Sequence, residues 1–347
     1  MSENVIVRRE GVAGVLSLNR PKALHALTLD MVHAMTAALL EWRDDPSVQA
    51  VIIDHAEGRG FCAGGDIAFL RNSALNDGGV SGRKFFHDEY QLNHLIYTYP
   101  KPVIAFMDGI TMGGGVGIGQ PARFRVATEN TRLAMPETGI GLFPDVGGGW
   151  YLSRLKGRLG QFLALTGARL DGAECQWSGL SSHYLPSNAL EQAKQQIAGG
   201  DAPDVVLSAL SSSLPPARIA DNAALITQHF AADRYEDILS SLKADNSEWA
   251  AKELATLSTK SPQTCKVALR QLRESLGCAD FAANMVMEYR IGSRVLTLPD
   301  FAEGVRAVIV DKDNAPAWNP ATAQGVTETM LDAIFAPLPA GEEWVPL

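Results

Sequence analysis

The chain has 347 residues, and 46% of them are hydrophobic, which is enough for one large domain, or a domain with an appendage, around a sizeable core. Its formal net charge of −9 argues against a surface for nucleic acid or an anionic membrane, because both need an excess of basic residues. The four cysteines are widely spaced with no Cys-x-x-Cys pair, which excludes an evident zinc site or disulfide framework.

No apolar stretch reaches the length of a transmembrane helix, and the first ten residues lack the apolar core of a signal peptide. We therefore expect a cytoplasmic protein without a membrane partner.

The first two hundred residues predict alternating strands and helices. Residues 5–8 and 12–19 alternate apolar and polar side chains around Gly11, which predicts a β-hairpin. Thr28 is expected to cap a helix with one apolar stripe that continues to about Asp44. Further along, the pattern predicts a strand over 48–55, a glycine-rich loop over 57–66, a helix over 81–99, a buried strand over 103–107 followed by a helix, and short strands over 124–128 and 132–134.

After about residue 190, the strand signals fade and amphipathic helical patterns take over. Glycine and proline cluster between residues 195 and 215, which indicates a boundary. We therefore predict an α/β core over residues 1–200 and a mainly helical region over residues 201–347 that covers the site, mediates oligomerisation, or both. Helices are expected over 223–230, 235–242, 249–257, 262–276 and 281–296.

Two glycine-rich turns each join a predicted strand to a predicted helix. One is Gly60-Phe-Cys-Ala-Gly-Gly-Asp66, and the other contains Gly113, Gly114 and Gly115. Taken alone, the first turn is as well explained by Asp66 acting as a helix N-cap. Together, the two turns could each offer one backbone N–H to a shared oxygen, which is the geometry of an oxyanion hole.

Two acids follow in a bent, apolar segment from Met135 to Gly149 that is rich in glycine and proline. Glu137 could be a solvated loop acid, and Asp145 could be another helix N-cap. However, the apolar neighbours Met135, Ile140, Leu142 and Phe143 would desolvate both carboxyls and raise their pKa values toward neutrality. Acids of that kind beside an oxyanion hole suit acid–base or acyl chemistry at a carbonyl group.

Other sequence motifs are absent or incomplete. There is no G-x-S-x-G sequence of a serine hydrolase and no P-loop lysine. The run from Gly117 to Ala122 fits a loose dinucleotide fingerprint, but Pro121 would interrupt the helix that such a fingerprint opens. The seven histidines show neither His-x-x-x-His nor H-E-x-x-H spacing, so no metal site is predicted.

At these residues the chain resembles the crotonase (enoyl-CoA hydratase/isomerase) superfamily and, within it, most of all the branch that hydrolyses 3-hydroxyisobutyryl-CoA. The resemblance is carried by segments spread over nearly the full length, and the acidic segment 136–149 is specific for the hydrolase branch. The matching segments are 19–24, 61–66, 87–90, 136–149, 300–307 and 311–313.

The resemblance implies a crotonase-like α/β spiral of ββα repeats that binds an acyl-CoA thioester. In that comparison Gly65 and Gly114 supply the two oxyanion amides, Glu137 is the catalytic glutamate, and Asp145 is the second acid of the hydrolase branch. Glu89 corresponds to a glutamate that contacts the substrate. Segments that hold the CoA chain and adenine correspond to Lys22, Ala23, Leu24, Cys62, Ala63 and Gly64, with Lys22 as a candidate for the CoA phosphates.

One departure from the hydratase pattern bears on the reaction. Hydratases of this superfamily carry a second glutamate at the position of Gly117, and adding water across a double bond needs both acids. The remaining pair, Glu137 with Asp145, implies hydrolysis of a short, branched 3-hydroxyacyl-CoA, as in valine catabolism. No separate cofactor is expected, because coenzyme A is part of the substrate. The alternatives are a crotonase-type isomerase that works with Glu137 alone, a hydratase of the same superfamily, and a non-catalytic acyl-CoA-binding member. A homo-oligomer is possible for each.

Overall fold

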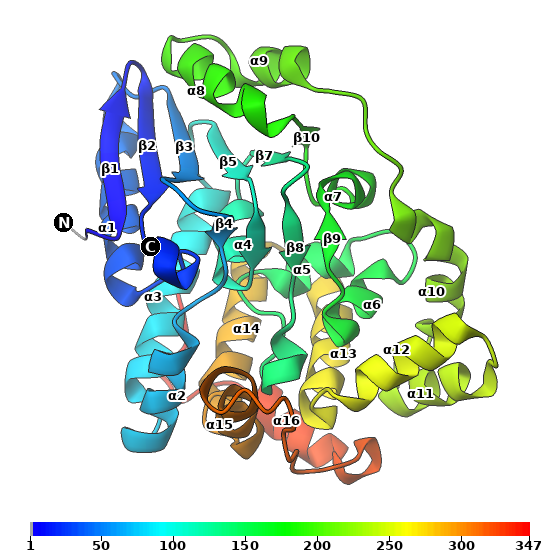
Figure 1. The fold of residues 1–347 in the computed structure, drawn as a ribbon. Coiled ribbons are helices and arrows are strands. Elements are labelled where there is room, and N and C mark those ends of the chain that lie inside the picture. The colour runs from blue at the N-terminus through cyan, green and yellow to red at the C-terminus, as the bar shows by residue number, and fades with distance from the viewer. Residues whose placement is uncertain (1–2) are drawn as a thin grey trace.

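The computed structural model describes residues 3–347, which form two β-sheets with helices packed around them (Figure 1). The larger sheet has the strand order β1-β2-β3-β5-β7-β10, and only its first pair is antiparallel. The smaller sheet has the order β4-β6-β8-β9. The strands are β1 (Val5–Glu10), β2 (Ala13–Leu18), β3 (Ala50–His55), β4 (Gly60–Cys62), β5 (Val103–Met107), β6 (Ile110–Met112), β7 (Phe124–Ala127), β8 (Arg132–Ala134), β9 (Leu170–Asp171) and β10 (His183–Tyr184).

The chain alternates between the two sheets in a repeated turn. It passes from β3 to β4, from β5 to β6 and from β7 to β8, and after each pair it enters a helix or a helical turn. Each turn therefore adds one strand to each sheet, which winds the chain into a spiral of ββα units. This observation confirms the predicted α/β fold class.

In the part of the chain before residue 211, helices and helical turns pack around the two sheets. Thr28 caps α1 as predicted, since its side chain accepts a hydrogen bond from the Met31 N–H. The helices and helical turns of this part are η1 (Pro21–Ala23), α1 (Leu29–Asp44), α2 (Ile67–Asn76), α3 (Val80–Tyr97), α4 (Gly114–Gly119), η2 (Glu137–Ile140), α5 (Gly148–Ser153), α6 (Leu159–Thr166), α7 (Gly172–Ser178), η3 (Ser187–Ala189), α8 (Leu190–Ala198) and α9 (Pro203–Leu210).

The remainder of the chain is helical, in agreement with the amphipathic patterns. Its helices α13 and α14 pack directly on α5, α6 and α3 of the core, and one continuous hydrophobic cluster includes residues from Val5 to Trp344. The division at residue 200 stays a prediction. The helical elements are η4 (Arg218–Asn222), α10 (Ala223–His229), α11 (Tyr235–Ala244), α12 (Glu248–Ser258), α13 (Pro262–Leu276), α14 (Phe281–Val295), α15 (Pro299–Val305), the π-helix η5 (Arg306–Val310), η6 (Ala323–Gly325) and α16 (Glu328–Phe335).

Four short strands, β4, β6, β9 and β10, were not predicted, and two of them, β4 and β6, lie beside the glycine turns. Strand β4 lies inside the segment that the sequence indicated as a loop, and β6 lies between the buried strand β5 and the glycine cluster. The two strands pair in parallel, so the turns that follow them emerge side by side from the same edge of the smaller sheet. Their short length and mixed composition gave no period-two signal.

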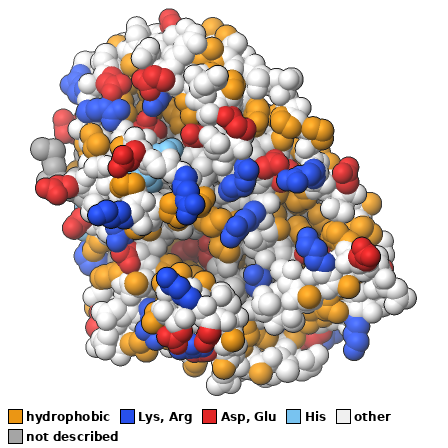
Figure 2. All heavy atoms as spheres, viewed as in Figure 1, with side chains coloured by type: hydrophobic (Ala, Val, Ile, Leu, Met, Phe, Trp, Pro, Cys, Tyr) orange, Lys and Arg blue, Asp and Glu red, His pale blue; other side chains and the backbone are white. Residues whose placement is uncertain are grey.

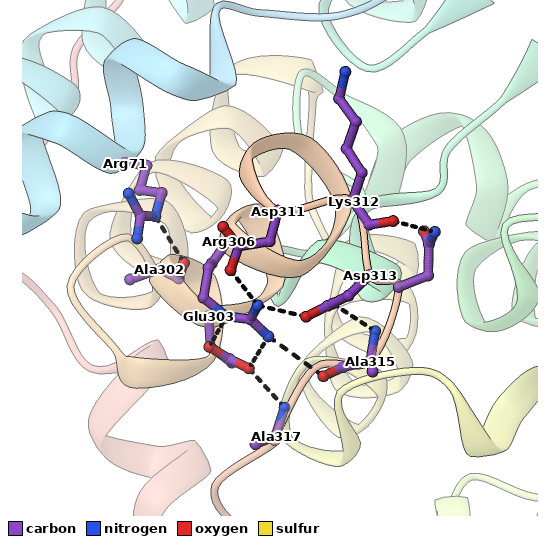
Figure 3. A network of polar contacts seen from close by, with 10 residues as sticks. Arg71, Ala302, Glu303, Arg306, Asp311, Lys312, Asp313, Ala315 and Ala317 are labelled. Carbon is purple, nitrogen blue, oxygen red and sulfur yellow. Dashed lines mark hydrogen bonds and ion pairs between the residues drawn. The ribbon is translucent and has the colours of Figure 1, made fainter.

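The segment around α15 fastens the helical region to the core. The Arg71 Nε on α2 donates to the carbonyl of Ala302, 2.9 Å away. Figure 3 shows that the Arg306 guanidinium reaches Glu303, Asp311 and Asp313, and its Nη1 lies 2.7 Å from Asp313 Oδ2. These contacts hold the loop after η5 against α15.

Close contact between α15 and η2 requires a glycine on α15. A Cβ atom on Gly304 would lie only 2.4 Å from the carbonyl carbon of Ile140, which belongs to the backbone and cannot move as a side chain does. We expect Gly304→Ala to lower the free energy of unfolding by about 1–3 kcal/mol, as overpacking does.

The matched control for this test is Gly277→Ala, where the added Cβ would lie 3.4 Å from the carbonyl oxygen of Glu274 at a negative φ. Chemical denaturation of both variants measures the difference. Equal stabilities of the two variants would contradict the close packing of α15 on η2.

Candidate active site

One cavity collects the residues that the sequence placed at the catalytic centre. It has an empty volume of about 480 Å³, which includes space open to the solvent. Gly65, Glu89, Gly114, Glu137 and Asp145 all line it, although they come from four separate parts of the fold. Apolar side chains complete the wall, including Ile67, Leu70, Phe85, Phe86, Ile140, Leu142 and Val146.

The two glycine turns approach each other so closely that side chains would not fit between them. A Cβ on Gly115 would lie 2.1 Å from the carbonyl oxygen of Cys62, and one on Gly114 would lie 3.2 Å from the carbonyl carbon of Gly64. In the described part of the chain, neither the Gly65 nor the Gly114 N–H donates a hydrogen bond to another residue. Both amides are therefore available to an oxygen of a ligand in the cavity.

Glu137 is a buried acid. It opens η2 directly after Pro136, is only 4% exposed, and its Oε2 has no hydrogen-bond partner among residues 3–347. Burial, together with the nearby Asp145 carboxylate, raises its pKa well above the ordinary glutamate value. The alternative of a solvated loop acid is therefore wrong.

Asp145 is also buried, and its carboxyl is held by a tyrosine. The Tyr90 hydroxyl on α3 donates to Asp145 Oδ2 over 2.9 Å. Burial raises the pKa of Asp145 to about 7, while the hydrogen bond from Tyr90 opposes that rise. Asp145 is not a helix cap, because the N-cap of α5 is Gly147. For Asp66 the capping alternative is right: its side chain accepts from the Phe69 N–H at the start of α2.

Glu89 brings a third carboxyl to the cavity from α3. It is almost fully buried, and its Oε1 has no partner among the described residues. Burial raises the pKa of Glu89 well above the usual glutamate value, and the negative charge of Asp145 adds to this rise. A Cβ on Gly114 would lie 2.5 Å from Glu89 Oε1, so the glycine lets this carboxyl reach the amide turn.

The space beside Gly117 is filled. A Cβ on Gly117 would lie 2.6 Å from Val146 Cβ and 2.9 Å from Asn93 Nδ2. Val146 has a φ of +53°, a conformation that costs a β-branched residue about 1–3 kcal/mol. The chain thus holds Val146 at the position that a second acid on α4 would need.

The residues predicted to hold CoA lie in two neighbouring segments. Ala63 and Gly64 line the cavity, and Cys62 is buried behind them. The Lys22–Leu24 turn does not line the cavity but adjoins it, because the Ala63 N–H donates to the carbonyl of Leu24. Figure 2 shows Lys and Arg side chains around a hollow near the centre of this face of the molecule.

Two residues near the acids were missed as site residues. Tyr90 lies in the predicted helix 81–99 and was not named as a site residue, because its hydroxyl contact depends on a loop far away in sequence. The Lys260 amine would lie 3.3 Å from a Cβ atom on Gly139. Burial lowers the pKa of Lys260, and the nearby charge of Glu137 opposes that change. No local sequence pattern connects Lys260 to Glu137.

The raised pKa of Glu137 predicts that this acid destabilises the fold at neutral and higher pH. Below the unfolded-state pKa both states carry the proton and the effect vanishes; as pH rises above it, the unfolded state gains by ionising. Glu137→Gln should therefore raise the free energy of unfolding at pH 8, by about 1–3 kcal/mol as for an unsatisfied buried group.

Thermal unfolding of this variant and of the wild type from pH 5 to pH 8 measures the effect. The gain should shrink toward pH 5. A Glu137→Gln variant that is less stable than the wild type at pH 8 would contradict the buried, unpaired state of this carboxyl.

Curated relatives agree in name and cover nearly the whole chain. The mitochondrial 3-hydroxyisobutyryl-CoA hydrolase of Xenopus laevis is 43% identical over 96% of this chain and 89% of its own length. The Homo sapiens protein of the same name is 40% identical over 97% of this chain and 89% of its own length. These comparisons confirm the resemblance to the hydrolase branch.

The expected cytoplasmic location is wrong, because these relatives are named as mitochondrial proteins. That expectation depended on the absence of a recognisable leader, which says nothing about the compartment of the relatives. Among residues 3–347, no helix has the length and apolar character needed to cross a membrane.

Solved structures share the fold almost completely. A carnitinyl-CoA dehydratase from Mycobacterium thermoresistibile superposes with a TM-score of 0.93, is 40% identical, and covers 98% of each chain. An enoyl-CoA hydratase from Rhodobacter sphaeroides 2.4.1 also gives a TM-score of 0.93, with 35% identity over 99% of this chain and 100% of its own. The sequence profile of the enoyl-CoA hydratase/isomerase family matches residues 13–335. The chain therefore belongs to the enoyl-CoA hydratase/isomerase family.

Proposed function

We propose that this protein hydrolyses 3-hydroxyisobutyryl-CoA to 3-hydroxyisobutyrate and CoA, as in valine catabolism. The observation that carries the proposal is the grouping of two unpaired backbone N–H donors, Gly65 and Gly114, with the buried acids Glu137 and Asp145 in one cavity. The names of the curated relatives support the same reaction.

In this mechanism the thioester oxygen accepts hydrogen bonds from the Gly65 and Gly114 amides. As the carbonyl carbon is attacked, negative charge develops on that oxygen, and each donor contributes roughly 3–4 kcal/mol to the transition state. Burial around the cavity strengthens these hydrogen bonds because water does not compete for the donors.

Glu137 acts on the carbonyl carbon from beside the oxyanion site. Its carboxylate either attacks directly, forming an anhydride and releasing CoA thiolate, or takes a proton from a water molecule that attacks in its place. Both routes add one water overall, and the leaving thiolate takes up a proton. The unpaired Oε2 and the raised pKa of Glu137 suit either role.

In this proposal Asp145 and Glu89 bind the 3-hydroxyl group of the substrate. Tyr90 occupies Asp145 Oδ2, which leaves Oδ1 to bind the 3-hydroxyl and to assist proton transfer. Glu89 lies on the same wall and helps to fix that hydroxyl. An acyl group without the hydroxyl would leave buried polar atoms unpaired, and this gives the site its selectivity.

The CoA portion lies along the turns that adjoin the cavity. The Lys22–Leu24 turn and the Cys62–Gly64 turn offer backbone contacts, and Lys22 is the candidate for a phosphate contact. The basic side chains around the hollow in Figure 2 suit a ligand that carries several phosphate charges. Coenzyme A is part of the substrate, so the mechanism needs no separate cofactor.

Hydration or isomerisation is the main rival, since the similar solved structures carry the names of a dehydratase and a hydratase. Val146 occupies the space beside Gly117 where a second acid would stand, which disfavours hydration. Isomerisation with Glu137 alone would leave Asp145 without a role. A non-catalytic acyl-CoA-binding protein would need neither acid.

A thiol-release assay with 3-hydroxyisobutyryl-CoA, run beside an assay for double-bond migration, tests the reaction. The wild type should release CoA, and Glu137→Gln should lower kcat by about 10²–10⁴-fold with nearly unchanged affinity for CoA, since acid–base or nucleophilic action is lost. Double-bond migration without thiol release would support the isomerase, and binding without turnover would support the non-catalytic protein.

Selectivity for the hydroxyl tests the role of Asp145. Asp145→Asn should lower kcat/KM for 3-hydroxyisobutyryl-CoA about tenfold or more beyond its effect on isobutyryl-CoA, because only the first substrate has the hydroxyl that Asp145 binds. Steady-state kinetics with the two thioesters measure the ratio. Equal losses on both substrates would refute the assignment.

A further inference from the structure

A buried glutamate from the helical region accepts hydrogen bonds from the segment that carries Asp145. Glu288 lies on α14 and is fully buried. Its Oε2 accepts from the Gly147 N–H over 2.7 Å, and its Oε1 accepts from the Gly149 N–H over 2.9 Å. These amides lie two and four residues after Asp145, at the start of α5.

The side chain of Glu288 accepts four hydrogen bonds. Burial raises its pKa to about 8, and the hydrogen bonds from Gly147 and Asn284 oppose that rise. Besides the two backbone amides, the side chains of Gln271 and Asn284 donate to Oε1 over 3.0 and 2.9 Å. No lysine or arginine forms an ion pair with Glu288 in the described chain, so the four N–H donors alone offset part of the cost of burying this carboxyl.

The same cluster also holds the other side of Asp145. Gln271 Nε2 on α13 donates to the carbonyl of Pro144 over 2.6 Å. Asp145 is therefore bracketed by contacts to residues 144, 147 and 149, all made by side chains of α13 and α14. Between these contacts the backbone passes through positive φ at Val146 and Gly147, a conformation that a free loop would leave.

We propose that Glu288 is a positioning residue for Asp145: by accepting from Gly147 and Gly149 it fixes the loop that aims Asp145 at the substrate hydroxyl. This inference rests on the proposed function for the identity of the substrate. Glu288 does not line the cavity, so its effect on the reaction passes through the loop.

The test compares Glu288→Gln with a matched control. Glutamine keeps the size of the side chain but replaces one acceptor with an NH₂ group, so one of the two glycine amides loses its partner. The control is Glu174→Gln: Glu174 is also buried and accepts from two backbone N–H groups, those of Asp171 and Ile219, and it does not line the cavity.

Hydrogen exchange followed by mass spectrometry gives a readout that does not depend on turnover. In Glu288→Gln, peptides containing residues 145–149 should exchange about tenfold faster or more, and in Glu174→Gln they should exchange as in the wild type. Unchanged exchange over 145–149 in Glu288→Gln would overturn the inference, whatever the substrate of the enzyme.

Kinetics give the second readout. Glu288→Gln should lose about tenfold or more in kcat/KM on 3-hydroxyisobutyryl-CoA relative to isobutyryl-CoA, and Glu288→Gln with Asp145→Asn should be no slower than Asp145→Asn alone. Equal losses on both substrates, or fully additive losses in the double variant, would overturn the positioning role. A wild type that hydrolyses neither thioester would refute the proposed function instead, while the exchange result would still decide whether Glu288 holds the loop.

Discussion

The parallel pairing of β4 with β6 is the constraint on which the site depends. Each strand is only three residues long, yet their pairing places the turn after Cys62 beside the turn after Met112. The backbones then approach so closely that Gly114 and Gly115 have no room for a side chain. Two amides from distant parts of the chain thereby face one cavity, and every step of the proposed chemistry starts from the oxygen they would hold.

The acids around that cavity are placed at a cost to the fold. Glu89, Glu137 and Asp145 are buried near one another, burial raises all three pKa values, and none of them forms an ion pair within residues 3–347. A protein tolerates such groups where their chemistry is needed and where the surrounding packing holds them in place. Here that packing comes from α13, α14 and α15, which contact the acidic segment and η2 directly.

The helical region is therefore part of the site's framework. Ser261 at the start of α13 donates its N–H to the carbonyl of Thr138, next to Glu137, and α15 packs on the same turn. This arrangement explains why one hydrophobic cluster extends over the sequence boundary near residue 200. The oligomeric state is a separate property, which these contacts do not determine.

Local patterns predicted much of the fold and the principal acids. The hairpin, the Thr28 cap, the strand Val103–Met107 and the helix Pro262–Leu276 were recognisable because their periodicity, capping residues and proline positions act locally. Glycine clusters and apolar neighbours likewise indicated the two turns, Glu137 and Asp145, and the family resemblance singled out Gly65 and Gly114 within those turns. Strands β4 and β6 were missed, because three residues carry too little periodicity. Tyr90, Lys260 and Glu288 were also missed as site residues, since each reaches the acids only through tertiary packing.

The most direct test of the central claim is a crystal structure of the protein with a non-hydrolysable analogue of 3-hydroxyisobutyryl-CoA. The account predicts that the carbonyl oxygen of the analogue lies within about 2.7–3.1 Å of both the Gly65 and the Gly114 amide nitrogens, with the Glu137 carboxylate beside the carbonyl carbon. An analogue bound with its carbonyl away from either amide would contradict it.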